Sequence, residues 1–354
     1  MERKIMTIFA GVLSGVMLLS MVLLIGIDDI HYKSEVLAKE ASESEQLKQS
    51  IADRIRDEAA NEAELASFAD KGQIRIAIPS GVDTGAIRYN EDTLDRFYQI
   101  VIPNVGEDYF DSNPIMGTVG NIEDFSAYED DNNAYFDITL NNVYSARATI
   151  ENGYLYIAFD NPHNVYNSVI VIDAGHGGRD VGAVEGSNYE KTIDLDIVYK
   201  LKELIDADPT IMAYYTRLGD TNPSLEERVS LANDVNADLF LSVHNNSLSG
   251  FGANSTSGTQ VLYYASDVTG LSMRFADICL EKLCRYLNST NRGLVNGDDI
   301  YIIHNSKSPV ALVEIGFLSN PEDLAKLKSD AYQKECAKAL YDSIKEMINE
   351  TYVE

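Results

Sequence analysis

Two of the five histidines of this 354-residue chain follow stretches of sequence with the apolar pattern of buried strands. His176 lies three residues after "VIVID", and His244 directly follows "DLFLSV". Glu314 closes a third stretch of this kind, "VALVE". A catalytic zinc ion needs three protein ligands and an open position for water, and imidazole and carboxylate groups are suitable ligands. These residues therefore predict a zinc site made of histidine and carboxylate groups.

The carboxylate ligand stays open at this point, because the sequence contains no local HExxH motif. Four acids near His176 are candidates: Asp173, Asp180, Glu185 and Glu190. Glu190 is modestly favoured, since it stands at the start of the helix that is predicted to follow the loop. The glycines of "AGHGG" would allow this loop to bring His176 over the edge of a sheet.

The elements that would position these groups have an α/β pattern over residues 166–354. Strand patterns alternate with helical patterns and occupy residues 169–173, 211–216, 238–243, 259–265 and 310–317. Ser224 and Glu227 have the spacing of a capping box, and Asn320 followed by Pro321 is typical of a helix start. This order predicts a mainly parallel (mixed) sheet with helices on both faces. Ligands of such sheets bind beyond the carboxyl ends of the strands, where both histidines would lie.

A series of ordered blocks resembles a known family. The blocks are "IDAGHGGRDVGAVEG", "YEK", "TRLGD", "LEERVSLAN", "ADLFLSVHNN", "GTQVLYY", "NRGL" and "VALVEIGFLSNPED". They are similar to the zinc-dependent N-acetylmuramoyl-L-alanine amidases of the type 3 family, which cut peptidoglycan. The resemblance covers residues 168 to about 350, roughly half of the chain.

The resemblance implies a site and a reaction. His176, Glu190 and His244 would be the ligands of Zn²⁺, and Glu314 would be the catalytic carboxylate. Zinc would activate a water molecule and polarise the amide carbonyl, while Glu314 moves a proton from that water to the departing amine. The bond cut would join the lactyl group of N-acetylmuramic acid to L-Ala of the stem peptide.

Two further residues in the matching blocks receive supporting roles. We expect Asp173 to hydrogen-bond to a ligand histidine. For Arg217 a structural ion pair and a contact with substrate are both open. Asn245 and Asn246 follow the second histidine where relatives often carry an alanine, and this departure would affect the rim of the pocket and not the metal site. Residues 264–292 have room for one helix, so we expect a site without the plugging insertion of some relatives. A protein activator stays open as a partner, but the sequence does not indicate one.

The N-terminal part has the features of a membrane anchor. Residues 5–27 are uncharged and long enough to cross a bilayer, and they lack the ending of a cleavable signal. Arg3 and Lys4 precede them, which predicts a cytoplasmic tail at residues 1–4 and an extracytoplasmic catalytic domain in a single-pass membrane protein. Residues 28–72 predict a helical stalk, with a dimerising coiled coil as the alternative.

Residues 73–165 predict a small β-rich domain. Asn152 and Gly153 separate two alternating stretches, as expected for a two-residue hairpin turn. The acidic stretch at residues 123–134 is interpreted as an exposed loop. The position and strand pattern of the domain are similar to those of the AMIN domains that bind cell wall in related amidases. An unrelated β-rich spacer is the alternative.

The charge of the chain excludes one class of partner. With 28 basic and 56 acidic side chains the net charge is −28, which would repel nucleic acid. Two other functions stay open beside the amidase. One is a non-catalytic peptidoglycan-binding scaffold, and the other is a zinc peptidase that acts on the stem peptide.

Overall fold

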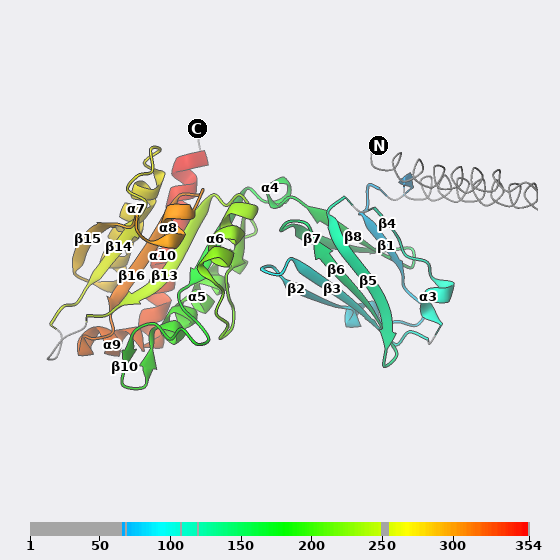
Figure 1. Cartoon of the computed structure of the whole chain (residues 1–354), viewed down its shortest axis with the longest axis horizontal. Helices are drawn as coiled ribbons and strands as arrows, with labels where there is room; N and C mark the ends of the chain where they lie inside the picture. Colours follow the sequence, from blue (N-terminus) through cyan, green and yellow to red (C-terminus); the bar gives the residue numbers. More distant parts are fainter. Residues whose placement is uncertain (1–65, 68, 107, 119, 249–254, 353–354) are drawn as a thin grey trace, which may run out of the picture. The chain divides into compact units, whose positions relative to one another are not determined.

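The structure is a computed structural model that describes residues 66–67, 69–106, 108–118, 120–248 and 255–352 (Figure 1). The predicted cytoplasmic tail, the membrane helix and most of the predicted stalk lie outside these residues. Within the described ranges, no helix is both long and apolar enough to cross a membrane.

The β-rich region consists of two four-stranded antiparallel sheets. The first has the order β4 (Met116–Gly117), β1 (Ile74–Ala77), β8 (Tyr154–Asp160), β7 (Ser145–Glu151). The second has the order β2 (Arg88–Asp92), β3 (Phe97–Pro103), β6 (Asn133–Leu140), β5 (Ile122–Asp130). One shared core joins their inner faces, and Tyr98 of β3 packs edge-on against Phe159 of β8. The short helices η1 (Thr84–Ala86), α3 (Tyr109–Ser112) and α4 (Pro162–Val165) complete this region.

The two turn predictions for this region have opposite outcomes. Asn152 and Gly153 have φ angles of 52° and 82° and join β7 to β8, which confirms the hairpin. The exposed loop predicted at residues 123–134 is wrong, because these residues form most of β5 and the start of β6. Phe125 and Ala127 of β5 pack against the core, while Ser126 between them and the acidic residues Glu123, Asp124 and Asp130 are exposed. The acidic side chains hid the alternation of a strand.

The second region is built on a six-stranded sheet. Its order is β12 (Ile211–Tyr215), β9 (Ser168–Ala174), β13 (Leu239–Asn246), β16 (Val310–Phe317), β14 (Thr259–Tyr263), β15 (Asn291–Asn296). The first four strands are parallel, β14 runs antiparallel to β16, and β15 is parallel to β14. This confirms the mixed, mainly parallel sheet. A separate two-stranded ribbon, β10 (Val184–Glu185) and β11 (Asn188–Tyr189), lies in the connection after β9.

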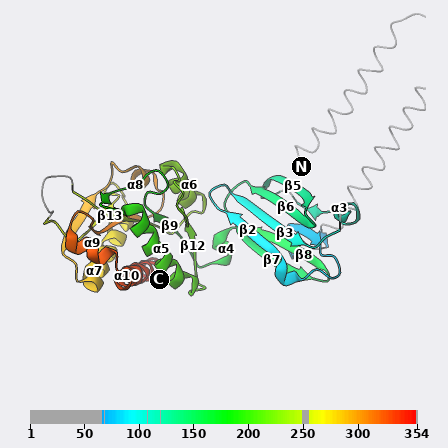
Figure 2. The same cartoon turned by 90° about the horizontal axis from the view of Figure 1, so that it is seen from below.

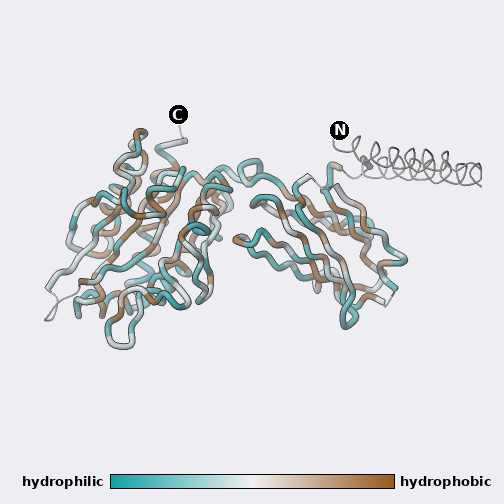
Figure 3. Tube along the Cα trace, viewed as in Figure 1, coloured by the Kyte–Doolittle hydropathy of each residue, from teal (hydrophilic) through white to brown (hydrophobic). Residues whose placement is uncertain are grey.

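Helices cover both faces of this sheet (Figures 1 and 2). One face carries α5 (Glu190–Asp206), α7 (Leu271–Leu287) and α10 (Asp330–Tyr352), and the other carries α6 (Leu225–Asp234) and α8 (Tyr301–Asn305). Side chains of β9 alternate between them: Ile170 and Ile172 pack beneath α5, and Val169 and Val171 pack beneath α6. Hydrophobic residues accordingly follow the strands and the inner helix faces (Figure 3).

Helix starts follow the predicted signals. The capping box of α6 is formed, with Ser224 Oγ accepting from the backbone N–H of Glu227 and Glu227 Oε2 accepting from that of Ser224. Asn320 caps α9 (Pro321–Leu327). The helix that starts at Pro321 is short, because α9 ends at Leu327 and a separate helix, α10, begins at Asp330.

Candidate metal centre

Three of the predicted site residues meet at one edge of the six-stranded sheet. His176 follows β9, His244 lies near the end of β13, and Glu190 is the first residue of α5. Glu190 Oε1 lies 3.1 Å from His176 Nε2 and 3.0 Å from His244 Nδ1. The imidazole rings meet edge to face with centroids 4.8 Å apart. Two imidazoles and a carboxylate thus converge on one point from three elements.

This arrangement suits a divalent metal ion. The donor atoms of His176, Glu190, His244 and Asp194 all lie within 4.8 Å of one another. The histidine side chains are 22% and 16% exposed and that of Glu190 is 6% exposed, so the group is shielded but reachable. Nitrogen and oxygen donors of this kind are the usual ligands of catalytic zinc, which keeps one position open.

The four acids considered as the third ligand differ in their contacts with the histidines. Only Glu190 bonds to both histidines. Asp180 Oδ2 is 2.9 Å from Nδ1 of His176, where a carboxylate orients a ligand ring and leaves Nε2 free for a metal. Asp173 lies beneath the sheet edge, and Glu185 is exposed on β10.

Asp194 was missed by the sequence reasoning. It lies one turn after Glu190 on α5 and is fully buried. Its Oδ1 accepts a hydrogen bond from Asn245 Nδ2 at 2.7 Å, and its Oδ2 has no hydrogen-bond partner among the described residues. Burial raises the pKa of Asp194 well above its ordinary value. The signal that could have found it is the four-residue spacing from Glu190, which places both acids on one helix face.

The pKa values of Glu190 and His176 are shifted by the hydrogen bonds between the carboxylate and the histidine rings. Burial alone would raise the pKa of this carboxyl, but hydrogen bonds from His176 and His244 keep it well below the ordinary value. Burial would lower the pKa of His176, and its bond to Glu190 outweighs this and raises that pKa to about 9. Glu190 therefore places negative charge between the two imidazole rings, and these rings would have to be neutral to bind a metal ion.

Glu314 stands beside the ligand group on the neighbouring strand. It is the register partner of His244 in the parallel pair β13 and β16. Its Oε2 is buried without a hydrogen-bond partner in the described parts of the chain, and burial raises the pKa of the carboxyl to about 7. A carboxyl group with a pKa near the working pH can both take and give a proton.

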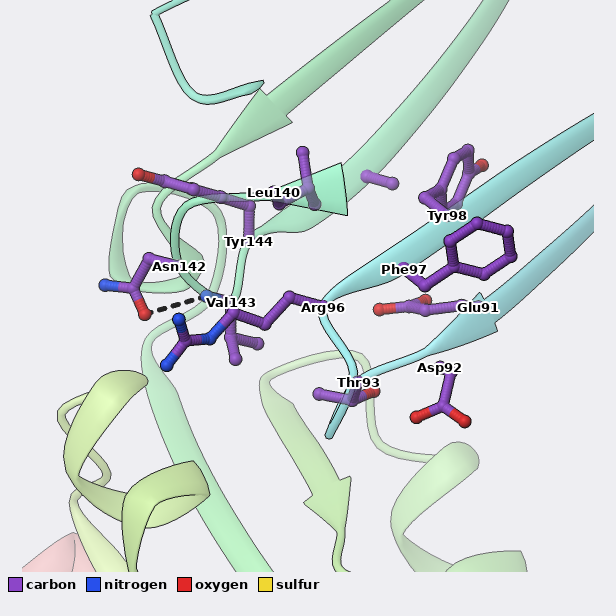
Figure 4. A pocket seen from close by; sticks show the side chains of 11 residues that line it. Glu91, Asp92, Thr93, Arg96, Phe97, Tyr98, Leu140, Asn142, Val143 and Tyr144 are labelled. Carbon is purple, nitrogen blue, oxygen red and sulfur yellow. Dashed lines mark hydrogen bonds between the residues drawn. The ribbon is translucent and has the colours of Figure 1, made fainter. Parts of the chain in front are cut away.

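A cleft of about 250 Å³ opens beside the two histidines. Its polar wall includes Asp173, Asp180, Asn222 and Arg228, and its apolar wall includes Pro223, Leu225 and Ile302. A second pocket, between the β2–β3 turn and the β6–β7 connection, includes Arg96, Asn142 and Tyr144 (Figure 4). It holds only about 10 Å³, too little for a ligand larger than water. The cleft at the histidines is therefore the candidate substrate site.

The two supporting residues differ from their predicted roles. The hydrogen-bond partners of Asp173 are Thr216, Arg228 and Ser242, so the expected bond to a histidine ring is wrong. The Asp173 side chain is buried, and its two oxygens accept hydrogen bonds from these three residues and not from a metal ligand. Arg217 is only 3% exposed and donates to four backbone carbonyls, in place of the ion pair or substrate contact that was expected.

Comparison with known proteins gives a consistent result. The family model described as N-acetylmuramoyl-L-alanine amidase matches residues 170–346, half of the chain. This confirms the resemblance drawn from the sequence blocks.

Individual relatives match the same half. The chain is 35% identical over 178 residues to N-acetylmuramoyl-L-alanine amidase LytC of Bacillus subtilis, covering 50% of this chain and 35% of that protein. It is 30% identical over 190 residues to the germination-specific N-acetylmuramoyl-L-alanine amidase of Bacillus subtilis, covering 50% of this chain and 78% of that one. It is 40% identical over 185 residues to the uncharacterized protein YqiI of Bacillus subtilis, covering 51% of this chain and 84% of that protein.

A solved structure shares the fold of the second region. The crystal structure of N-acetylmuramoyl-L-alanine amidase from Clostridium difficile 630 is 28% identical, with a TM-score of 0.50. The match covers 53% of this chain and 99% of that chain.

Proposed function

This chain belongs to the N-acetylmuramoyl-L-alanine amidase family of hydrolases, and we propose that it cuts peptidoglycan between the lactyl group of N-acetylmuramic acid and L-Ala of the stem peptide. The observation that carries the proposal is the position of Glu190 Oε1 between His176 Nε2 and His244 Nδ1, beside the buried Glu314. This arrangement offers a metal site and a separate proton-transferring carboxyl, the two groups that metal-assisted amide hydrolysis uses.

Zinc is the proposed ion, with His176, Glu190 and His244 as its ligands. Their donor set fits because it combines two imidazoles and one carboxylate. When bound, the ion supplies Lewis-acid polarisation of the scissile carbonyl and of the attacking water. Asp180 orients the ring of His176, and the backbone N–H groups of Ala183 and Asn245 hold Oε2 and Oε1 of Glu190.

Glu314 is the proposed catalytic carboxyl. It takes a proton from the water that attacks the amide carbon and delivers it to the nitrogen as the C–N bond breaks. The products are a lactyl carboxylate on the intact glycan and a free α-amino group on L-Ala. Burial of Glu314 supports this role, because it brings the pKa of the carboxyl to about 7.

The test is a product assay on the full-length chain purified in detergent. Purified peptidoglycan is incubated with the parent chain, with and without a chelator, and with Glu314→Gln. We expect new amino termini on L-Ala only with metal and with Glu314 present. New amino termini on other stem residues would indicate the peptidase, and binding of peptidoglycan without any release would indicate the scaffold.

We also propose that the chain is a single-pass membrane protein with its catalytic domain outside the cytoplasm. The support is in the sequence, where Arg3 and Lys4 precede the uncharged residues 5–27. Carbonate extraction of membranes, followed by protease treatment of protoplasts, tests this. A chain released by carbonate, or one protected from protease, would contradict the proposal.

The β-rich region is the proposed wall-binding domain. On the outer face of its second sheet, Tyr128 stacks on Tyr135 with ring centroids 5.0 Å apart. Next to them, Asn90 donates to Gln99, which donates to Asp137. Aromatic and amide groups on one open face suit a sugar chain. Sedimentation with purified cell walls tests this in a Glu314→Gln background, where Tyr128→Ala should weaken binding and unchanged binding would contradict it.

A further inference from the structure

The loop that carries His176 has an unusual backbone. His176, Gly177 and Gly178 have φ angles of 57°, 129° and 53°, so three consecutive residues have positive φ. This conformation is unfavourable for a residue with a side chain, and at His176 it must be held by its surroundings. The direction of the His176 ring depends on it, because the ring leaves the chain at this residue.

One buried guanidinium group holds this loop from the side of α6. Arg228 is 3% exposed, and its Nη2 donates to the carbonyl of His176 at 2.7 Å. Its Nη1 donates to the carbonyl of Ala174 at 2.8 Å and to Asp173 Oδ1 at 2.6 Å. Its Nε donates to the carbonyl of Pro223 at 3.0 Å. Arg228 thus connects β9, the His176 loop and the start of α6.

A second buried guanidinium group, that of Arg217, holds the same loop from the segment that follows β12. Arg217 Nε donates to the carbonyl of Ala174 at 3.0 Å, and Nη2 donates to that of Gly175 at 2.6 Å. Nη2 also donates to the carbonyl of Lys191 at 2.8 Å, directly after the ligand Glu190. Arg217 therefore joins the segment of one ligand to the segment of another.

The two side chains together bond every backbone carbonyl from Ala174 to His176. A planar guanidinium group can hold several acceptors at fixed angles, whereas a lysine ammonium is a compact charge on a flexible stem. The charge of Arg228 is balanced by Asp173, whose oxygens also accept from Thr216 and Ser242.

We infer that Arg228 and Arg217 are positioning residues for the metal centre, setting the backbone from which His176 reaches the ion and the spacing between His176 and Glu190. The inference rests on the proposed metal site. It assigns to Arg228, which the sequence reasoning did not select, an effect on the metal ligand His176 that acts through the backbone.

The test measures metal affinity in the full-length chain. Zinc Kd is determined by competition with a chromogenic chelator, and the Co²⁺-substituted protein gives an absorption spectrum that reports ligand geometry. Arg228→Lys keeps a positive charge beside Asp173 but loses the paired hydrogen bonds of the guanidinium group to the carbonyls of Ala174 and His176. We expect its zinc Kd to rise about 10- to 100-fold, with a changed Co²⁺ spectrum.

Arg285→Lys is the matched control, since Arg285 is an exposed arginine on α7 whose contacts are Glu281 at 3.4 Å and the ring of Tyr286 at 5.5 Å. A folded Arg228→Lys with the parental Kd and spectrum would overturn the inference. If that variant does not fold, Arg217→Lys is measured in the same way and decides by the same criterion. A parent chain that binds zinc without hydrolysing peptidoglycan refutes the proposed reaction alone, and a parent chain that binds no zinc overturns both.

Discussion

Glu190 and Asp194 lie one turn apart on the same face of α5, yet only Glu190 bonds to the histidines. Asp194 bonds instead to the side chain of Asn245, whose backbone N–H donates to Glu190. Helix α5 is thereby fixed to β13 at two successive turns. Asp194 contacts the strand that carries His244, and Glu190 lies between the two histidine rings.

This relationship predicts different results for two isosteric changes. Glu190→Gln replaces a charged ligand with a neutral amide. Changing only a hydrogen-bond partner of a metal ligand already lowers metal affinity by about 10- to 100-fold. We therefore expect zinc Kd to rise by more than about 100-fold. Asp194→Asn keeps an oxygen that accepts from Asn245, so its zinc Kd should stay within about threefold of the parent. A large loss of affinity in Asp194→Asn would make Asp194 a direct ligand.

Gly175 allows the close approach of His244 to the loop before His176. A Cβ atom at Gly175 would overlap the imidazole ring of His244, without any strain from a positive φ. Gly175→Ala should displace that ring and lower kcat/KM by about 100-fold, as ångström-scale misplacement does. Gly219→Ala is the control, because a Cβ atom there meets nothing within 4 Å. Equal activity of the two variants would refute the packing argument.

Patterns within single segments were sufficient to predict much of the fold. The apolar stretches of β9, β13 and β16 fixed the sheet edge where His176 and His244 meet, and Ser224 marked the start of α6. Strand β5 was missed, because its few core-facing side chains, such as Phe125, stand among acidic residues that resemble those of an exposed loop.

Residues that act across elements were harder to predict. Arg228 serves the His176 loop only because α6 packs against β9, and Asp194 meets Asn245 only because α5 packs against β13. Contacts between distant segments leave no local spacing in the sequence. The role of Asp173 was mistaken for the same reason, as its partner Arg228 lies 55 residues away.

Glu314→Gln separates proton transfer from metal binding. The variant loses the carboxyl that we propose to move the proton, so kcat should fall by about 10²- to 10⁴-fold. Glu314 is outside the group of donor atoms within 4.8 Å, so zinc Kd should be unchanged. Replacing this buried ionisable carboxyl with a neutral amide should also raise the Tm of the metal-free protein at neutral pH, because burial penalises the charged form. Zinc loss together with activity loss would show that Glu314 acts as a ligand.

Asp208 fastens the end of α5 to the last helix. Its Oδ2 accepts from Tyr341 at 2.9 Å and from Lys345 at 2.7 Å, and its Oδ1 accepts from the backbone and hydroxyl of Thr210. Burial alone would raise the pKa of Asp208, but the hydrogen bond from Lys345 leads the interactions that lower it below the ordinary value. Asp208→Asn should lower the free energy of unfolding by about 1–2 kcal/mol at neutral pH. This value is kept small because Lys345 is partly exposed and solvent screens its charge.

The pH dependence of that cost follows from the lowered pKa. A carboxyl whose pKa is depressed on folding stabilises the protein above its unfolded pKa of about 3.9, and the contribution is lost as the pH falls through the folded value. The difference between parent and Asp208→Asn in urea unfolding should thus be full at pH 7 and shrink below about pH 4. Asp206→Asn, which changes an exposed pair with Lys202, should differ from the parent by less than about 0.5 kcal/mol. A difference between parent and Asp208→Asn that stays constant down to low pH would show that shape, and not the charge of Asp208, joins the two helices.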